Sequence, residues 1–260
     1  MKRLLSISLL IVTLLCLTGA QFPVGFWTQA AAASSYRTPN ILGWKCNGTG
    51  TTEAASDSDT GPTLTLSNAG LRGTGFTPGG STSDLEFNAS YTAASTATVN
   101  YASNNIITIE FRLYLPVANI GSEQRILETD TDWTANLNDW GVFWGVGSSY
   151  ETNLNLVWID ASGAGNKWHI TTGGLISNTW YHVALVLDNS AACGVPTAYV
   201  NGSSATIVKW QGTFGGTSGV IATKTLHAGG SGSYAKIKDV RIWAGARSGA
   251  NIALDAVDYP

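Results

Sequence analysis

The segment Asn178–Ser203 reads N-T-W-Y-H-V-A-L-V-L-D-N-S-A-A-C-G-V-P-T-A-Y-V-N-G-S, and it decides the fold more than any other part of the chain. From Trp180 to Asp188 side chains on both faces of the predicted strand are largely apolar, so both faces are expected to be covered. A second apolar run ends at Asn201-Gly202, a pair that favours a tight hairpin turn because glycine tolerates positive φ. The segment therefore predicts two strands of an all-β protein.

Similar runs recur along most of the chain, separated by turn-forming residues. Turns spaced about 8–12 residues apart favour a sandwich or barrel, and no amphipathic helix of useful length is expected. Ile106–Leu115 alternates apolar and polar residues, as a half-buried strand does. The other expected strands are Thr63–Ser67, Asp84–Asn88, Gln124–Glu128, Trp140–Val146, Asn153–Ile159, Lys167–Thr172, Thr197–Asn201, Ala205–Trp210, Lys224–Ala228 and Ala235–Trp243.

Three further motifs, in order around the hairpin, resemble laminin-G-like jelly rolls of the concanavalin A-like lectin/glucanase superfamily. They are D-L-E-F-N-A-S at Asp84–Ser90, the strand within Asn105–Leu115, and the closing run Leu226–Trp243, which ends I-K-D-V-R-I-W. The Asn105–Leu115 strand lacks the tryptophan that is usual in the family. The resemblance covers roughly residues 84–250. It implies an all-β fold, a two-sheet antiparallel β-sandwich of jelly-roll topology.

The start of the chain has the pattern of an export signal. Lys2 and Arg3 precede the apolar run Leu4–Leu17 and a small-residue exit within residues 1–20. This run is shorter than the roughly 20 apolar residues that span a bilayer, so no membrane insertion is expected after cleavage. We predict a secreted or cell-surface protein with an irregular extension at 21–62, one edge strand near Ile41–Cys46, and a jelly-roll domain at 63–260.

The net charge bears on the expected partners, and the cysteine content bears on disulfide formation. The net charge is −3 with no basic block, so nucleic acid is not an expected partner. Cys46 and Cys193 follow the signal, and in an oxidising compartment they can form a disulfide. The sequence does not show whether they come within bridging distance, so two unpaired thiols remain the alternative.

One acidic run suggests catalysis. Glu128, Asp130 and Asp132 alternate along the chain and would share one face of a strand. Glucanases of the superfamily present their catalytic carboxylates in this way. Here, however, Thr129 and Thr131 stand where the glucanase motif has apolar residues, and Asp132 stands where it has glutamate. We therefore expect no enzyme and keep a glycoside hydrolase as the minority alternative.

The same region offers ligands for Ca²⁺, which prefers hard oxygen donors. Candidate metal ligands are Asp130, Asp132, Asn136 and Asp139, and a solvated acidic loop is the alternative. Asp130 and Asp132, with the nearby Trp133, are also the candidate ligand-binding residues.

The remaining conspicuous residues favour structural roles. Aromatic rings dominate core energetics, so Trp140, Trp144, Trp158 and Trp168 are expected in the core rather than in an exposed sugar-binding row. His182 is expected to be structural, and Asp239 with Arg241 to form an ion pair that supports the fold.

The sequence thus predicts a secreted, non-catalytic recognition domain that binds carbohydrate or a protein partner at a cell or particle surface. The first alternative is a structural or assembly protein of a surface appendage or virion. Its mark would be a large exposed apolar patch or an unpaired edge strand without a sugar-sized groove.

Overall fold

In the computed structural model the chain divides into residues 1–37 and a second unit, 38–260. The structure describes residues 39, 41–44, 46, 52–53, 61–65, 72–74, 83–86, 95–115, 124–129, 139–145, 154–159, 165–171, 175, 178–190, 194–211, 221–229 and 235–257. The expected export signal lies outside these residues. No helix among them is both long and apolar enough to cross a bilayer.

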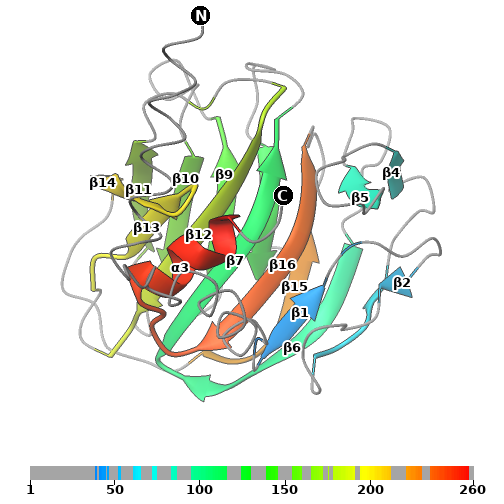
Figure 1. The fold of residues 1–260 in the computed structure, drawn as a ribbon. Helices are drawn as coiled ribbons and strands as arrows, with labels where there is room; N and C mark the ends of the chain where they lie inside the picture. The colour runs from blue at the N-terminus through cyan, green and yellow to red at the C-terminus, as the bar shows by residue number, and fades with distance from the viewer. Residues whose placement is uncertain are drawn as a thin grey trace, which may run out of the picture. The chain divides into compact units, whose positions relative to one another are not determined.

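The described residues form antiparallel strands and one helix (Figure 1). Their bounds are β1 Leu42–Trp44, β2 Thr52–Glu53, β3 Leu64–Thr65, β4 Arg72–Thr74, β5 Ser83–Glu86, β6 Ser95–Asn104, β7 Ile106–Tyr114, β8 Gln124–Thr129, β9 Trp140–Trp144, β10 Leu154–Ile159, β11 Gly165–Thr171, β12 Trp180–Asp188, β13 Thr197–Val200, β14 Ser203–Gln211, β15 Ile221–Ala228, β16 Lys236–Ala244 and α3 Gly249–Val257.

The strands form two sheets joined by one long strand. Sheet A runs β13-β12-β7-β16-β5-β4, and β1 also pairs with β16. Sheet B runs β2-β3-β6-β15-β8-β9-β10-β11. β14 belongs to both sheets, because Ser203 to Ala205 pair with β13 and Thr206 onward pairs with β11. The predicted two-sheet antiparallel sandwich of the concanavalin A-like jelly-roll kind is confirmed.

The core takes alternate residues from both sheets. On β7 the main apolar cluster includes Ile107, Ile109, Phe111 and Leu113, while the residues between them face the other side. Five tryptophans are at most 2 % exposed: Trp44, Trp140, Trp144, Trp158 and Trp168. The predicted core role is therefore confirmed for the four strand tryptophans, and none of them can form an exposed sugar-binding row.

The hairpin that decided the fold is present as expected. β12 covers Trp180–Asp188, and the turn residues Asn201 and Gly202 have φ of 49° and 76°. Two consecutive positive φ values characterise the type I′ hairpin turn, which suits Asn-Gly. Trp243 is buried with 6 % exposure, whereas Trp180 is only partly buried and its ring centroid lies 5.4 Å from that of Tyr114.

β2 and β4, strands of two and three residues, were not expected, and neither were two longer elements. The first is β6, which pairs with β15 in sheet B. The second is α3, which lies across the face of sheet A that points away from the core (Figure 1), where Ile252 packs against Ala184 and Val186 of β12. The prediction that no useful helix occurs was therefore wrong at the C-terminal end of the chain.

Some residues of the predicted N-terminal extension belong to the hydrophobic core. β1 pairs with β16, and Leu42, Trp44 and Cys46 are fully buried in the main cluster. Part of the segment 21–62 therefore contributes to the sandwich rather than only preceding it.

Candidate functional site

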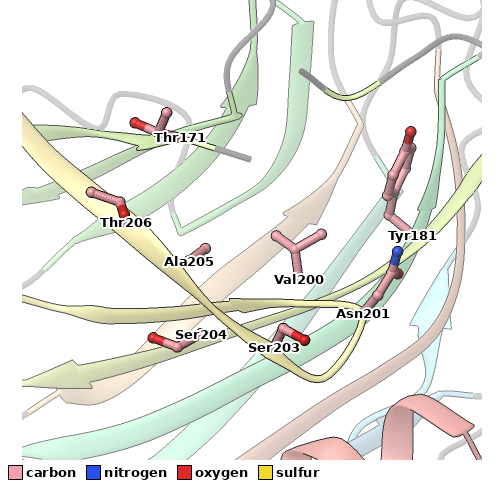
Figure 2. Close-up of a pocket in the computed structure, with 8 residues that line it drawn as sticks. All are labelled: Thr171, Tyr181, Val200, Asn201, Ser203, Ser204, Ala205 and Thr206. Carbon is pink, nitrogen blue, oxygen red and sulfur yellow. The ribbon is translucent and has the colours of Figure 1, made fainter. Parts of the chain in front are cut away.

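A pocket of about 320 Å³ opens where β14 passes from sheet A to sheet B (Figure 2). Four strands and one turn contribute to it: Tyr181 is the second residue of β12, Thr171 ends β11, and the remaining lining residues come from the β13–β14 hairpin between Val200 and Thr206. Because β14 passes from one sheet to the other, residues of both sheets line the same pocket.

The pocket combines an apolar centre with a polar margin. Figure 2 shows Val200 and Ala205 between Tyr181 on one side and Thr171 and Thr206 on the other. The other lining groups are the side chains of Asn201, Ser203 and Ser204. None of the eight lining residues carries a formal charge, so the pocket is lined by an aromatic ring, aliphatic groups, hydroxyls and one amide.

Backbone hydrogen bonds fix Asn201 in this pocket. The amide N–H of Asn201 donates to the carbonyl oxygen of His182 over 2.8 Å, and the amide N–H of His182 donates to Oδ1 of Asn201 over 2.9 Å. The side-chain amide of Asn201 is therefore held next to Tyr181, the residue that precedes His182.

The two hydrogen bonds between His182 and Asn201 are called the clamp below. On the α3 side of sheet A, next to the clamp, lies a buried group of charged side chains. Nε2 of His182 lies 3.2 Å from Oε2 of Glu110, and Oε1 of Glu110 lies 3.2 Å from Nε of Arg247. Arg247 also pairs with Asp255 of α3. These contacts join β7, β12 and α3, and His182 is structural, as expected.

The predicted ion pair on β16 belongs to the same group. Nε of Arg241 lies 2.8 Å from Oδ1 of Asp239, and the two side chains are almost fully buried. Asp239 has a φ of 54° at the point where the β16–β7 register shifts. The predicted pairing of Asp239 with Arg241 is confirmed.

Burial perturbs the titration of this group. Burial raises the pKa of Glu110 to about 7, against the opposing effect of Arg247 and Arg241. Burial, aided by the nearby Arg112, lowers the pKa of His182 to about 4. Burial also raises the pKa of Asp255. At neutral pH His182 is therefore uncharged, while Glu110 is close to its midpoint.

Of the acidic residues that the sequence singled out, the structure describes only two. Asp130, Asp132, Trp133 and Asn136 are outside the described residues, and only Glu128 and Asp139 are placed. Their metal-binding and ligand-binding roles stay predictions.

Glu128 lies on β8 with 3 % exposure, and Oε1 of Glu128 is 3.1 Å from Nη1 of Arg125. Its neighbour Leu127 packs in the core, so Glu128 faces the opposite side of sheet B. The structure therefore places an arginine, and not a second described carboxyl, against the candidate catalytic group.

Asp139 is fully buried and directly precedes β9. Oδ1 of Asp139 lies 2.8 Å from Nζ of Lys224, and the hydroxyl of Thr129 donates to Oδ1 over 3.2 Å. Among the described residues no group of three His, Cys, Asp or Glu side chains is placed to hold a metal ion. The calcium site stays a prediction, because most of its candidate ligands lie outside the described residues.

His169 and Cys46 form local contacts. His169 Nδ1 lies 2.5 Å from Oδ1 of Asn155 on the neighbouring strand of sheet B, and burial lowers the pKa of His169. Cys46 is buried, and its Sγ donates to the carbonyl oxygen of Trp44 over 3.6 Å. Cys193 lies outside the described residues, so the disulfide stays a prediction.

The pocket itself was missed in the sequence. Tyr181 and Asn201 were assigned to the fold motif, and Ser203, Ser204 and Thr206 are unremarkable in a chain rich in hydroxyl side chains. The available signal was the clustering of these small polar residues directly after the Asn-Gly turn.

Solved structures share the fold. The ligand binding domain of botulinum neurotoxin serotype D, solved in complex with N-acetylneuraminic acid, superposes with a TM-score of 0.63 at 14 % identity, covering 86 % of this chain and 52 % of that chain. For the receptor binding domain of the botulinum neurotoxin C/D mosaic serotype these values are 0.57, 14 %, 83 % and 50 %. The chain thus spans about half the length of these structures. Such low identity shows a shared fold alone.

The family assignment rests on the sequence itself. No curated protein matches the chain. The family model described as the Concanavalin A-like lectin/glucanases superfamily matches residues 87–253, which is more than half of the chain and includes the hairpin and the closing strand. The chain therefore belongs to the concanavalin A-like lectin/glucanase superfamily, in its laminin-G-type family.

Proposed function

We propose that this chain is a secreted, non-catalytic recognition domain that binds carbohydrate at a cell or particle surface through the hairpin pocket. The observation that carries the proposal is the uncharged pocket formed by Tyr181 and the β13–β14 hairpin. Its volume of about 320 Å³ is near the small end of ligand sites, which run from about 300 to 1,000 Å³. The pocket is therefore suited to a single sugar unit at the end of a glycan.

The chemistry of the lining matches a neutral sugar. A pyranose ring presents C–H groups on its faces and hydroxyls around its edge. The ring of Tyr181 with Val200 and Ala205 offers an apolar surface, and the hydroxyls of Ser203 and Thr206 can both donate and accept hydrogen bonds. No cationic side chain lines the pocket to pair with a carboxylate, so we expect neutral sugars to be preferred over acidic ones.

The acidic loop is proposed as a second contact surface. Asp130, Asp132 and Trp133 would touch the ligand there, and Ca²⁺ would be held by Asp130, Asp132, Asn136 and Asp139. For Asp139 this requires exchange of the Lys224 ammonium, which lies 2.8 Å from its carboxylate.

The hydrolase alternative finds less support. Retaining glycosidases hold two carboxyls about 5–5.5 Å apart. No carboxyl lines the hairpin pocket, and Glu128 on sheet B is paired with Arg125. If Glu128 were catalytic, a Glu128→Gln variant would keep the fold and lose hydrolysis of a β-glucan substrate, and wild-type protein would show that hydrolysis first.

The large exposed apolar patch expected of the assembly alternative is not found among the described residues. The exposed large apolar side chains there are Val195, Val208, Leu254 and Val257, distributed over a loop, β14 and α3. Singly scattered apolar residues are normal on a protein surface. A pocket of sugar size is present instead.

A glycan array tests the proposal, probed once with Ca²⁺ and once with a chelator. Neutral glycans that bind under both conditions support the pocket, and binding only with Ca²⁺ supports the acidic loop. Silence in both overturns carbohydrate recognition, and capture of a surface protein without any glycan signal favours a protein partner.

Matched variants then locate the site. Thr206→Arg places a long cation in the pocket and is expected to remove the hits, whereas Thr197→Arg changes an exposed threonine of the same hairpin outside the lining. Unchanged array binding by Thr206→Arg would place the site elsewhere.

A further inference from the structure

Tyr181 and His182 connect two parts of the molecule. Successive side chains of a strand point to opposite faces, so Tyr181 lines the pocket while His182 points to the α3 side of sheet A. His182 is 4 % exposed, and its backbone makes both hydrogen bonds that hold Asn201. Any displacement of His182 is therefore transmitted to two lining residues of the pocket.

The ring of His182 contacts the carboxyl group of Glu110. The charged side chains around Glu110 belong to β7, β12, β16 and the C-terminal segment that includes α3. Arg112 lies on the same strand, His182 on β12, Lys238, Asp239 and Arg241 on β16, and Arg247 and Asp255 on α3 and the segment before it. Among them, Nε2 of His182 and Nε of Arg247 lie within 3.2 Å of the two carboxyl oxygens of Glu110. The carboxyl group thus bridges the pocket strand and the segment that leads into α3.

The proton on Glu110 decides which atom donates in this contact. A protonated carboxyl donates its O–H to the unprotonated Nε2 of His182. When the carboxyl releases that proton to solvent, the contact requires the Nε2–H tautomer, so the ring proton moves from Nδ1 to Nε2. Within the described residues Nδ1 of His182 has no hydrogen-bond partner, so neither tautomer is locked.

We infer that Glu110 and His182 are positioning residues for the hairpin pocket, and that ionisation of Glu110 tightens the hold of His182 on Asn201 and thereby strengthens sugar binding. The effect on binding rests on the proposed function, whereas the clamp stands on its own contacts. A hydrogen bond to an ionised group is roughly twice as strong as a neutral one. The ionised pair therefore preorganises Asn201, which reduces the cost of ordering the pocket when a ligand binds.

NMR of the full chain tests the clamp without any ligand. The side-chain amide of Asn201 is followed from pH 5.5 to 8.5 in ¹⁵N-labelled protein, and its shift is expected to titrate with a midpoint near the pKa of Glu110, about 7. Glu110→Gln should abolish this titration. Asp188→Asn should leave it in place, because it changes a carboxylate at the other end of β12 that accepts from Ser190.

A second variant covers the case in which Glu110→Gln does not fold. Arg247 is the charged neighbour that most lowers the pKa of Glu110, so Arg247→Gln is expected to raise the midpoint of the Asn201 titration. A flat Asn201 signal in the wild type, or an unshifted midpoint in Arg247→Gln, overturns the positioning role.

Binding supplies the functional readout. Glucose, galactose, mannose and N-acetylglucosamine are titrated separately at pH 6 and pH 8. For any that binds, the Kd is expected to be about two- to tenfold lower at pH 8, which corresponds to modest coupling energies between sites. The same Kd at both pH values, with the amide titration present, overturns the effect on binding alone. If none of the four binds at either pH, the pocket's proposed sugar function fails, and the amide titration still decides the clamp.

Discussion

Arg112 reaches from the middle of β7 to the last turn of α3, where its Nη2 lies 3.3 Å from the carbonyl oxygen of Asp255. The same nitrogen lies 3.3 Å from the carbonyl oxygen of Ala256. The last carbonyls of a helix lack partners within the helix, and a cation there also complements the helix dipole. Arg112 therefore anchors the C-terminal end of α3 to sheet A.

We predict that Arg112→Met loosens α3. Loss of these charge-assisted bonds leaves buried carbonyls without a donor and should lower the free energy of unfolding by about 1–3 kcal/mol. Chemical denaturation measures this loss, and hydrogen exchange should accelerate in α3 more than in β12. Lys236→Met is the control, because it removes a cation of β16 whose Nζ lies 5.8 Å from the ring centroid of Tyr114, in a weak cation–π contact. Equal losses in the two variants would contradict an anchoring role.

The Glu110–His182 pair predicts two opposing effects of pH on stability. Glu110 has a pKa of about 7 in the folded state against an ordinary 4.5, so between these values the folded state holds more protons and stability falls as pH rises. His182 has a pKa of about 4 against an ordinary 6.5, so across that window the unfolded state holds more protons and stability rises with pH. In the wild type the two slopes oppose each other from about pH 4.5 to 6.5.

Single variants should separate the two slopes. In Glu110→Gln only the His182 contribution remains, so the free energy of unfolding should rise with pH between about 4 and 6.5. In His182→Gln it should fall as pH rises from about 4.5 to 7. Urea denaturation at half-unit pH steps measures both profiles. Parallel profiles in the two variants would show that other groups dominate the pH dependence.

A side chain at Gly202, the turn glycine of the hairpin, should clash with α3. This clash can be measured separately from the strain of positive φ. Gly202 has φ of 76°, and a Cβ there would lie 2.9 Å from Cα of Ala253 in α3. Gly245 also has a positive φ, 88°, but a Cβ there would meet no atom within 4 Å. Both alanine variants carry the cost of positive φ, of order 1 kcal/mol.

Only Gly202→Ala should also push α3 away from the hairpin, so its thermal midpoint should fall further than that of Gly245→Ala. Differential scanning calorimetry measures both midpoints. If Gly202→Ala were no more destabilising than Gly245→Ala, the contact between the hairpin and α3 would be loose enough to yield.

The sequence predicted those elements whose apolar periodicity is strong. β12 matches the expected Trp180–Asp188 because apolar residues of high β propensity fill both faces. β6 was missed although Ala97, Val99 and Tyr101 alternate with exposed residues, since serine, threonine, alanine and asparagine fill most of the strand and leave little apolar contrast. α3 was missed because only Ile252 and Asp255 are buried, so its inward face is half ionic and shows little helical hydrophobic period.

The candidate site was harder to predict for a physical reason. Carboxylates such as Asp130 stand out in a chain with few charges, so sequence reasoning drew the site there. The hairpin pocket instead uses Ser203, Thr206 and Asn201, residue types that are common throughout the chain. It exists only because β14 changes sheets and brings Thr171 of sheet B towards Tyr181 of sheet A, a tertiary arrangement without a local signature.

Asp139, a candidate calcium ligand, has a carboxylate that contacts the ammonium group of Lys224. Oδ1 of Asp139 lies 2.8 Å from Nζ of Lys224, and Asp139 is fully buried. Breaking a buried pair by removing one partner typically costs about 3–5 kcal/mol, while replacing both partners with apolar residues costs far less. Lys224→Met should therefore be strongly destabilising, and the double variant Lys224→Met/Asp139→Leu should recover much of the loss.

Calcium distinguishes a structural pair from a metal site in the same experiment. An ion that binds the folded state raises stability by an amount that grows with its concentration. If Asp139 serves only as the partner of Lys224, Asp139→Asn should lower the free energy of unfolding equally in Ca²⁺ and in chelator. A larger loss in Ca²⁺ than in chelator would instead assign Asp139 to the metal as well, with calcium displacing the Lys224 ammonium group from its carboxylate.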